Sequence, residues 1–216
     1  MRTVSQAVEE VLARSPFLSE ALAEGVANNA EVARRIKPDV EKYLYEEVSQ
    51  SAISMALHRL GKQRTRLNFG ARFLKKMNGM TVRSNLVEFS FLTSSDALEK
   101  LGTLSKAAHK KRDAFFDLSR GARETLLIVS SELADEAAAL LKHAPELRRT
   151  ENLSAITMHL PEESLRVPGV YYPILKALAM EGLSFVEVMS ARTELSIIFE
   201  EAQVERAFSV LKKITS

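Results

Sequence analysis

The chain of 216 residues contains no cysteine and no tryptophan, and its eight glycines are widely spaced. The lack of cysteine excludes disulfides, thiolate chemistry and cysteine-ligated zinc, and it is typical of a reducing compartment. The glycines are never closer than nine residues apart, so no Gly-rich phosphate-binding loop can form. No apolar run is long enough to cross a bilayer, and the first residues lack the apolar core of a signal peptide. We therefore expect a cytoplasmic protein with no membrane contact.

Catalytic patterns are also missing. There is no Gly-x-Ser-x-Gly nucleophile elbow. The adjacent acids Glu162-Glu163 and Glu200-Glu201 lie at the ends of predicted elements, where solvated carboxylates are ordinary. The histidines have no metal-ligand spacing; they are His58, His109, His143 and His159. We predict that the chain has no catalytic residues, no metal and no cofactor, and is not an enzyme.

The net charge of +2, from 30 basic and 28 acidic residues, is unevenly distributed. Residues 50–80 hold seven basic residues and no acid, whereas residues 146–216 carry a net charge of −2. A local excess of positive charge is typical of a segment that faces a polyanion.

Residues 1–60 contain the start signals of several short helices. Polar capping residues and prolines precede apolar stripes of helical spacing, as at Ala52, Ile53, Ala56, Leu57 and Leu60. The start signals are a Thr3/Gln6 capping box, Ser15-Pro16, Asn29, Lys37-Pro38 and Ser49. This pattern predicts a helical domain over residues 1–79, with a new helix beginning at Lys37-Pro38 and the last helix at Gln50.

The stretch "NAEVARRIKPDVEKYLYEEVSQSAISMALHRLGKQRTR", residues 29–66, resembles a helix-turn-helix of the winged kind. The resemblance implies that residues 50–60 form a recognition helix that binds double-stranded DNA. Base edges would face Ser51, Ser54 and His58, and phosphates would face Arg59, Lys62, Arg64 and Arg66. The alternative is a small helical bundle that dimerises, with its basic residues solvated or paired with acids.

The pattern changes to period two at Val87, Phe89 and Phe91, which indicates a strand. From there the chain contains a weak repeat, in which residues 114–143 align with residues 184–213 without a gap. Each copy predicts the order strand, helix, strand, strand, helix. In the second copy these elements cover 153–160, 169–181, 183–189, 194–200 and 202–213. The order favours an α+β fold of two ferredoxin-like (βαββα) units, with helices on one face of an antiparallel sheet.

The stretch "VPGVYYPILKALAMEGLSFVEVMSARTELSIIFEE", which begins at Val167, resembles the small regulatory ACT module. More narrowly, it is similar to the paired ACT modules at the regulatory end of aspartate kinases. The resemblance implies two ACT-like modules, at 80–150 and 151–216, that form a homodimer. It also implies a free amino acid bound at Pro168, Gly169, Val170 and Tyr171. The ammonium group would be accepted by Glu194 or by carbonyls of the strand that Glu194 opens.

The residues also permit a simpler interpretation, in which Pro168-Gly169 only makes a tight turn and the neighbouring tyrosines only pack. In the first copy, Leu98 and Glu99 replace the Pro-Gly pair, so a matching ligand turn is not expected there. Three hypotheses follow. The chain is an amino-acid-responsive regulator that binds DNA, a non-catalytic partner of an enzyme such as an aspartate kinase, or a structural oligomerisation module.

Overall fold

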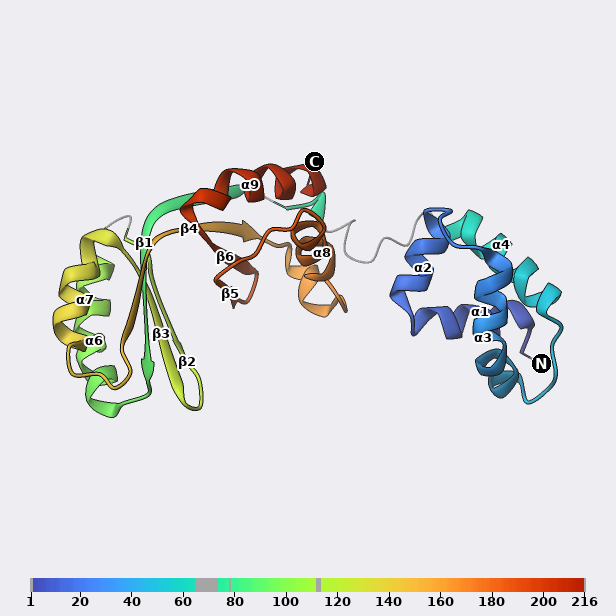
Figure 1. Cartoon of the computed structure of the whole chain (residues 1–216), viewed down its shortest axis with the longest axis horizontal. Coiled ribbons are helices and arrows are strands. Elements are labelled where there is room, and N and C mark those ends of the chain that lie inside the picture. The colour runs from blue at the N-terminus through green and yellow to red at the C-terminus, as the bar shows by residue number, and fades with distance from the viewer. Residues whose placement is uncertain (1, 65–73, 78, 112–113, 216) are drawn as a thin grey trace. The chain divides into compact units, whose positions relative to one another are not determined.

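The computed structural model describes residues 2–64, 74–77, 79–111 and 114–215. The chain divides into two compact units, Met1–Phe69 and Gly70–Ser216, which we call the helical unit and the sheet unit. Figure 1 labels the elements of both units. None of the described helices is both long and apolar enough to span a membrane.

The helical unit consists, over its described residues, of α1 (Val4–Ala13), α2 (Pro16–Ala23), α3 (Asn29–Leu44) and α4 (Gln50–Arg64). The predicted capping box at α1 is confirmed, because Thr3 and Gln6 exchange side-chain and backbone hydrogen bonds. The helices bury one apolar stripe each in a common core; its most buried members are Ala7, Val8, Ala33, Val40, Ile53 and Leu57. The stripe predicted on the last helix therefore faces this core.

The predicted helix start at Lys37-Pro38 is wrong, because α3 continues through Pro38. Proline removes one backbone donor from a helix interior and usually interrupts it. Here the ring is exposed, and the burial of Ile36 and Val40 on either side keeps the helix continuous. The N-cap is Asn28 rather than Asn29, since the Asn28 side chain accepts hydrogen bonds from the N–H groups of Ala30 and Glu31.

The described residues of the helical unit include no strand. A winged helix needs a β-hairpin after its recognition helix, so the described part of this unit does not contain the predicted wing. Arg66 lies outside the described residues.

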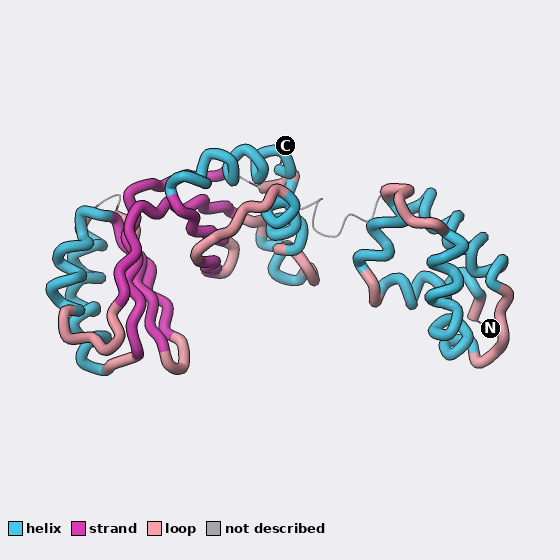
Figure 2. Tube along the Cα trace, viewed as in Figure 1, coloured by secondary structure: helices cyan, strands magenta, loops and turns pink. Residues whose placement is uncertain are grey.

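The sheet unit is an α+β structure built on one antiparallel sheet of six described strands, ordered β2-β3-β1-β4-β6-β5. Figure 2 shows the strands as one layer. The order strand, helix, strand, strand, helix occurs twice. The first set is β1 (Met80–Leu92), α6 (Ser95–Lys110), β2 (Phe116–Arg120), β3 (Glu124–Ser130) and α7 (Ala134–Leu141). The second set is β4 (Arg148–His159), α8 (Tyr172–Met180), β5 (Glu187–Ala191), β6 (Glu194–Glu200) and α9 (Glu201–Thr215).

Each pair of helices covers its own part of the sheet (Figure 1). Helices α6 and α7 pack with Val87, Phe89 and Leu127 in one core, and α8 and α9 pack with Ile156 and Ile197 in another. We call the opposite side of the sheet the helix-free face. A third apolar cluster, made by strands and loops, lies on this face; its buried members are Leu86, Ile128, Leu153, Ala155 and Ile198. Side chains that alternate along a strand therefore reach different cores.

The two halves of the sheet unit are joined by β1 and β4. The first part of β1 pairs with the last part of β4, from Met80↔Met158 to Arg83↔Ala155. The pairing register shifts twice near Leu86, and Asn85 and Asn152 have left-handed backbones at φ 58° and 57°. Such bulges bend paired strands and increase their twist. Each central strand consequently contributes hydrogen bonds to both halves.

The gapless repeat is correct for only part of the chain. Strands β3 and β6 occupy the positions that the gapless alignment matches to each other. In the first strands, however, Leu86 pairs with Ser130 and Leu153 pairs with Glu200, so Leu86 corresponds to Leu153. The gapless alignment instead matches Leu86 to Ile156. The difference arises because the second half has a longer connection from its first strand to its first helix, and the shorter helix α8 only partly compensates for that length.

The first helix of the second half also differs from the prediction. Helix α8 begins at Tyr172, three residues later than predicted, after a turn.

Candidate functional site

The candidate site is the turn at residues 168–171, which leads from the segment after β4 into α8. Gly169 has a left-handed backbone with φ +72°. A Cβ at this position would meet Tyr172 Cβ only at 4.0 Å, so the backbone conformation and not crowding favours glycine here. Two hydrogen bonds of 3.0 Å close the turn, from Tyr172 N–H to the Gly169 carbonyl and from Leu175 N–H to the Tyr171 carbonyl.

The N-terminus of α8 lacks a side-chain cap. Among the described residues, the structure assigns no acceptor to the N–H groups of Gly169 and Val170. By contrast, Ser94 caps α6 and accepts a hydrogen bond from Ala97 N–H at 3.4 Å. Uncapped N–H groups at the positive end of a helix dipole attract a carboxylate or another small anion. The first helix of the second half therefore has uncapped N–H donors at its N-terminus, whereas the first helix of the first half has a capped one.

Tyr171 fixes this turn against the sheet. Its ring packs against the core below α8 and α9, and its hydroxyl lies 2.8 Å from the hydroxyl of Ser190 on β5. The β5–β6 hairpin is held at the same end by the bond from Leu160 N–H to the Thr193 carbonyl, 2.7 Å. Our sequence interpretation missed Ser190, because nothing in the local pattern shows which residue the tyrosine reaches.

The structure places Glu194 differently from the rest of the predicted site. Glu194 is the first residue of β6, and its side chain shares the helix-free face with Ser196 and Ile198. Tyr171 packs on the opposite face of the sheet. In the first half, Leu98 and Glu99 lie inside α6 and form no turn.

Carboxylates gather on the helix-free face. Glu88 is 7% exposed, and its Oε2 has no hydrogen-bond partner among the described residues. Burial raises the pKa of Glu88, and the nearby Glu187 carboxylate raises it further. Burial also raises the pKa of Asp117, with a second contribution from Glu194. Burial alone raises the pKa of Glu187. These acids hold their protons more tightly in the folded chain.

The predicted DNA-contacting residues are only partly available. His58 and Arg59 are exposed on α4, but Ser54 is half-buried. The Ser51 hydroxyl lies 3.1 Å from the hydroxyl of Ser49, at the start of the helix. Lys62 and Arg64 belong to the last turn of α4, where the structure describes the backbone alone.

Within the described ranges, no group of three or more His, Asp or Glu side chains is placed to hold a metal ion.

Comparison with known proteins identifies the fold. No family model matches the sequence, and no curated protein matches it. The α+β arrangement of the sheet unit is similar to that in solved structures of aspartate kinases and of their regulatory subunits. Aspartate kinase from Clostridium acetobutylicum matches with a TM-score of 0.54 and 12% identity, over 65% of this chain and 34% of that chain.

Two further matches are regulatory or multi-subunit structures. The ligand-free regulatory subunit of aspartate kinase from Thermus thermophilus has a TM-score of 0.52 and 14% identity, over 64% of this chain and 97% of that chain. A structure of aspartokinase alpha and beta subunits matches with a TM-score of 0.52 and 16% identity, over 64% of this chain and 97% of that chain. This chain thus spans about a third of the Clostridium enzyme but nearly all of the Thermus regulatory subunit. At these identities the comparison shows the fold alone.

We predict that Glu88→Gln stabilises the sheet unit at neutral pH by roughly 1–3 kcal/mol, because glutamine removes a buried negative charge that lacks a partner among the described residues. Because the pKa of Glu88 is raised in the folded state, the free energy of unfolding of the wild type should rise as pH falls from neutral through that pKa. The variant lacks this rise, so its advantage should shrink in acid. Urea denaturation at a series of pH values measures the difference.

The matched control is Glu163→Gln, which neutralises an exposed carboxylate in the same unit. It should change the free energy of unfolding by less than about 0.5 kcal/mol. A Glu88→Gln variant that is less stable than the wild type at pH 8 would show that the carboxylate is satisfied in the native protein.

Proposed function

We propose that this chain is a non-catalytic regulatory protein that senses a free amino acid through its sheet unit. The observation that carries the proposal is the uncapped turn at Gly169 and Val170, because its N–H groups are free to bind a carboxylate. Support comes from the fold, which this unit shares with the regulatory subunit of aspartate kinase from Thermus thermophilus.

The proposed complex has one ligand turn per chain. The amino acid's carboxylate receives hydrogen bonds from Gly169 and Val170, and Tyr171 holds the turn against β5 through Ser190. Backbone carbonyls at the start of β6 accept the ammonium group, since the Glu194 side chain lies on the other face of the sheet. We treat residues 80–150 and 151–216 as two ACT-like modules, of which only the second has an open turn.

The proposed output is regulation of a separate enzyme, such as an aspartate-kinase-like catalytic chain. This assignment rests on the match to the Thermus regulatory subunit, which covers 97% of that chain. The two halves of the sheet unit, which β1 and β4 connect, would adopt two arrangements. The amino acid would act by binding one of these arrangements more tightly than the other. A ligand shifts such an equilibrium only by its difference in affinity for the two states.

A homodimer through the sheet unit is part of this proposal. Strands β2 and β5 form the two edges of the described sheet, and each exposes an apolar side chain, Leu118 and Val188. Unpaired edges favour addition of another strand. We predict that sedimentation equilibrium gives about twice the chain mass of 24.1 kDa, and that Val188→Lys shifts the species to the monomer. A monomeric wild type at tens of micromolar would exclude this interface.

We predict that at least one free amino acid raises the melting temperature of the full chain. A ligand at 100 times its dissociation constant adds about 2.7 kcal/mol to the free energy of unfolding. Gly169→Ala should abolish that shift, because alanine is strained at φ +72° and will move the amides. A thermal-shift panel of the twenty amino acids measures both effects.

The control is Gly102→Ala on α6, where nothing lies within 4 Å of the added Cβ. This change should stabilise the helix by roughly 0.5–1 kcal/mol and leave the amino-acid response intact. If no amino acid shifts the wild type, or if Gly169→Ala responds like the wild type, the proposed sensor site is wrong.

Binding of double-stranded DNA by the helical unit is the second candidate function. The observation that favours it is the exposure of His58 and Arg59 on α4. Each neutralised phosphate adds about −0.9 to the slope of log affinity against log salt. We predict that replacing Arg59, Lys62, Arg64 and Arg66 by glutamine flattens this slope by about 3.6. Fluorescence anisotropy with duplex DNA at a series of salt concentrations measures the slope. Arg34→Gln, whose side chain pairs with Glu31, should leave the slope unchanged. A slope near zero for the wild type would remove this candidate.

A further inference from the structure

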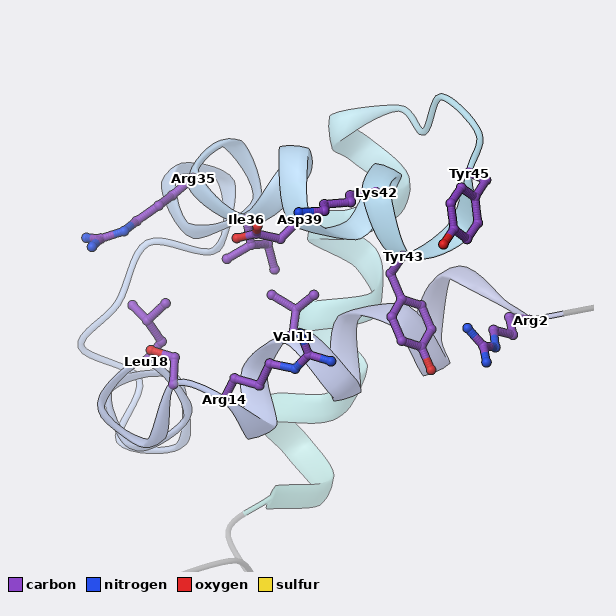
Figure 3. Close-up of a pocket in the computed structure, with 11 residues that line it drawn as sticks. Arg2, Val11, Arg14, Leu18, Arg35, Ile36, Asp39, Lys42, Tyr43 and Tyr45 are labelled. Atoms are coloured by element: carbon purple, nitrogen blue, oxygen red, sulfur yellow. The ribbon is translucent and has the colours of Figure 1, made fainter.

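A groove lies on the helical unit between one side of α3 and the corner that joins α1 to α2 (Figure 3). Its volume of about 540 Å³ falls in the range of pockets that hold small organic molecules. The aliphatic part of the lining consists of Val11 from α1, Leu18 from α2 and Ile36 from α3. None of the residues proposed above for amino-acid or DNA binding lines this groove.

The groove concentrates positive charge. Four basic side chains line it, Arg2, Arg14, Arg35 and Lys42, and Asp39 is its one acid among the described lining residues. The helical unit as a whole, residues 1–69, has ten basic and nine acidic residues. The groove thus carries a net charge of +3 in a unit with a net charge of +1. The basic residues have gathered here while most acids lie elsewhere.

Among the described residues, Asp39 is the one acid that offsets the four cations of the groove. On other parts of α3, Arg34 pairs with Glu31 at 2.6 Å and Lys37 pairs with Glu41 at 3.6 Å. Within the described part of the chain, the side chains of Arg14, Arg35 and Lys42 form no ion pair or hydrogen bond. Unpaired cations around an apolar floor repel one another and attract an anion.

Two tyrosines occupy one end of the groove. The Arg2 guanidinium lies over the Tyr43 ring, 4.6 Å from its centroid, and Figure 3 shows Arg2, Tyr43 and Tyr45 together. Tyr45 is 91% exposed and ends α3 with a left-handed backbone, φ 59°. Glycine or asparagine is usual at this position of a helix, and a bulky residue there is strained. The ring contributes no burial that would offset this strain, so its place beside the groove points to a contact with a ligand.

We propose that this groove binds a small organic anion that combines a flat apolar body with one acidic group. The acidic group, a carboxylate or a phosphate ester, is held by Arg14 and Lys42, whereas Arg35 points away from both and only adds positive charge at the border of the groove. The apolar body lies on Val11 and Ile36 and is covered at one end by a tyrosine ring. This ligand is distinct from the amino acid of the sheet unit, so the two sites are tested independently.

The probe is 8-anilinonaphthalene-1-sulfonate, an aromatic anion whose fluorescence increases on binding. The chain has no tryptophan, so protein emission does not interfere. We expect saturable binding to the full chain, and at least tenfold weaker binding to the double variant Arg14→Gln/Lys42→Gln. Arg34→Gln is the matched control, because it removes one charge from the same helix outside the groove, and it should bind the probe like the wild type. The neutral analogue N-phenyl-1-naphthylamine should bind at least tenfold more weakly.

Tyr45→Gly separates ligand binding from folding. Glycine adopts the left-handed conformation without strain, so the melting temperature should stay the same or increase. Loss of the ring should nevertheless weaken probe binding severalfold. A variant that is more stable and binds as well as the wild type would show that Tyr45 does not contact the ligand, and would overturn this geometry.

Competition identifies the acidic group. Displacement of the probe by AMP supports a phosphate ester, and displacement by indole-3-acetate supports an aromatic carboxylate. Displacement by neither, or by inorganic phosphate or duplex DNA at equal anion concentration, would overturn the proposal. Equal probe affinity of the wild type and Arg14→Gln/Lys42→Gln would overturn it as well.

Discussion

The antiparallel pairing of β1 with β4 is the constraint on which the sheet unit depends. Each of these strands extends past its own half, so the start of β1 borders the second half and the start of β4 borders the first. Asn85 and Asn152 take left-handed conformations at the register shifts, where asparagine is tolerated better than most residues. Neither half can lose its central strand without exposing the edge of the other.

This shared sheet carries two halves whose helix N-termini differ. Ser94 saturates a donor at the start of α6, whereas α8 begins after a glycine turn with no side-chain cap. A capped helix end is stabilised locally and has little left to offer a ligand. An uncapped end keeps its donors for an anion. In our proposal, this contrast assigns the binding role to the second half and a structural role to the first. The carboxylates of the helix-free face make that side unfavourable for a second anion.

The helical unit shows the same division between satisfied and unsatisfied groups. Its exposed Arg34 and Lys37 are paired within α3, and the groove cations are not. The sequence drew attention to residues 50–80, where the basic residues are not interrupted by acids. The cations of the groove went unnoticed because residues 2–42, over which they are spread, contain six basic and seven acidic residues. Only the packing of α1 and α2 against α3 brings them together.

The sequence by itself determined the α+β class, the order of strands and helices in each half, the capping box at Thr3 and the turn at Gly169, because these depend on periodicity and on neighbouring residues. Tertiary structure alone decided that α3 continues through Pro38, that Leu86 of β1 corresponds to Leu153 of β4, that Tyr171 reaches Ser190 and that Glu194 faces away from the turn. Each of these depends on contacts between residues distant in the chain. Such contacts are determined by the free energy of burial and by the pairing register of the strands, which cannot be predicted from neighbouring residues in the sequence.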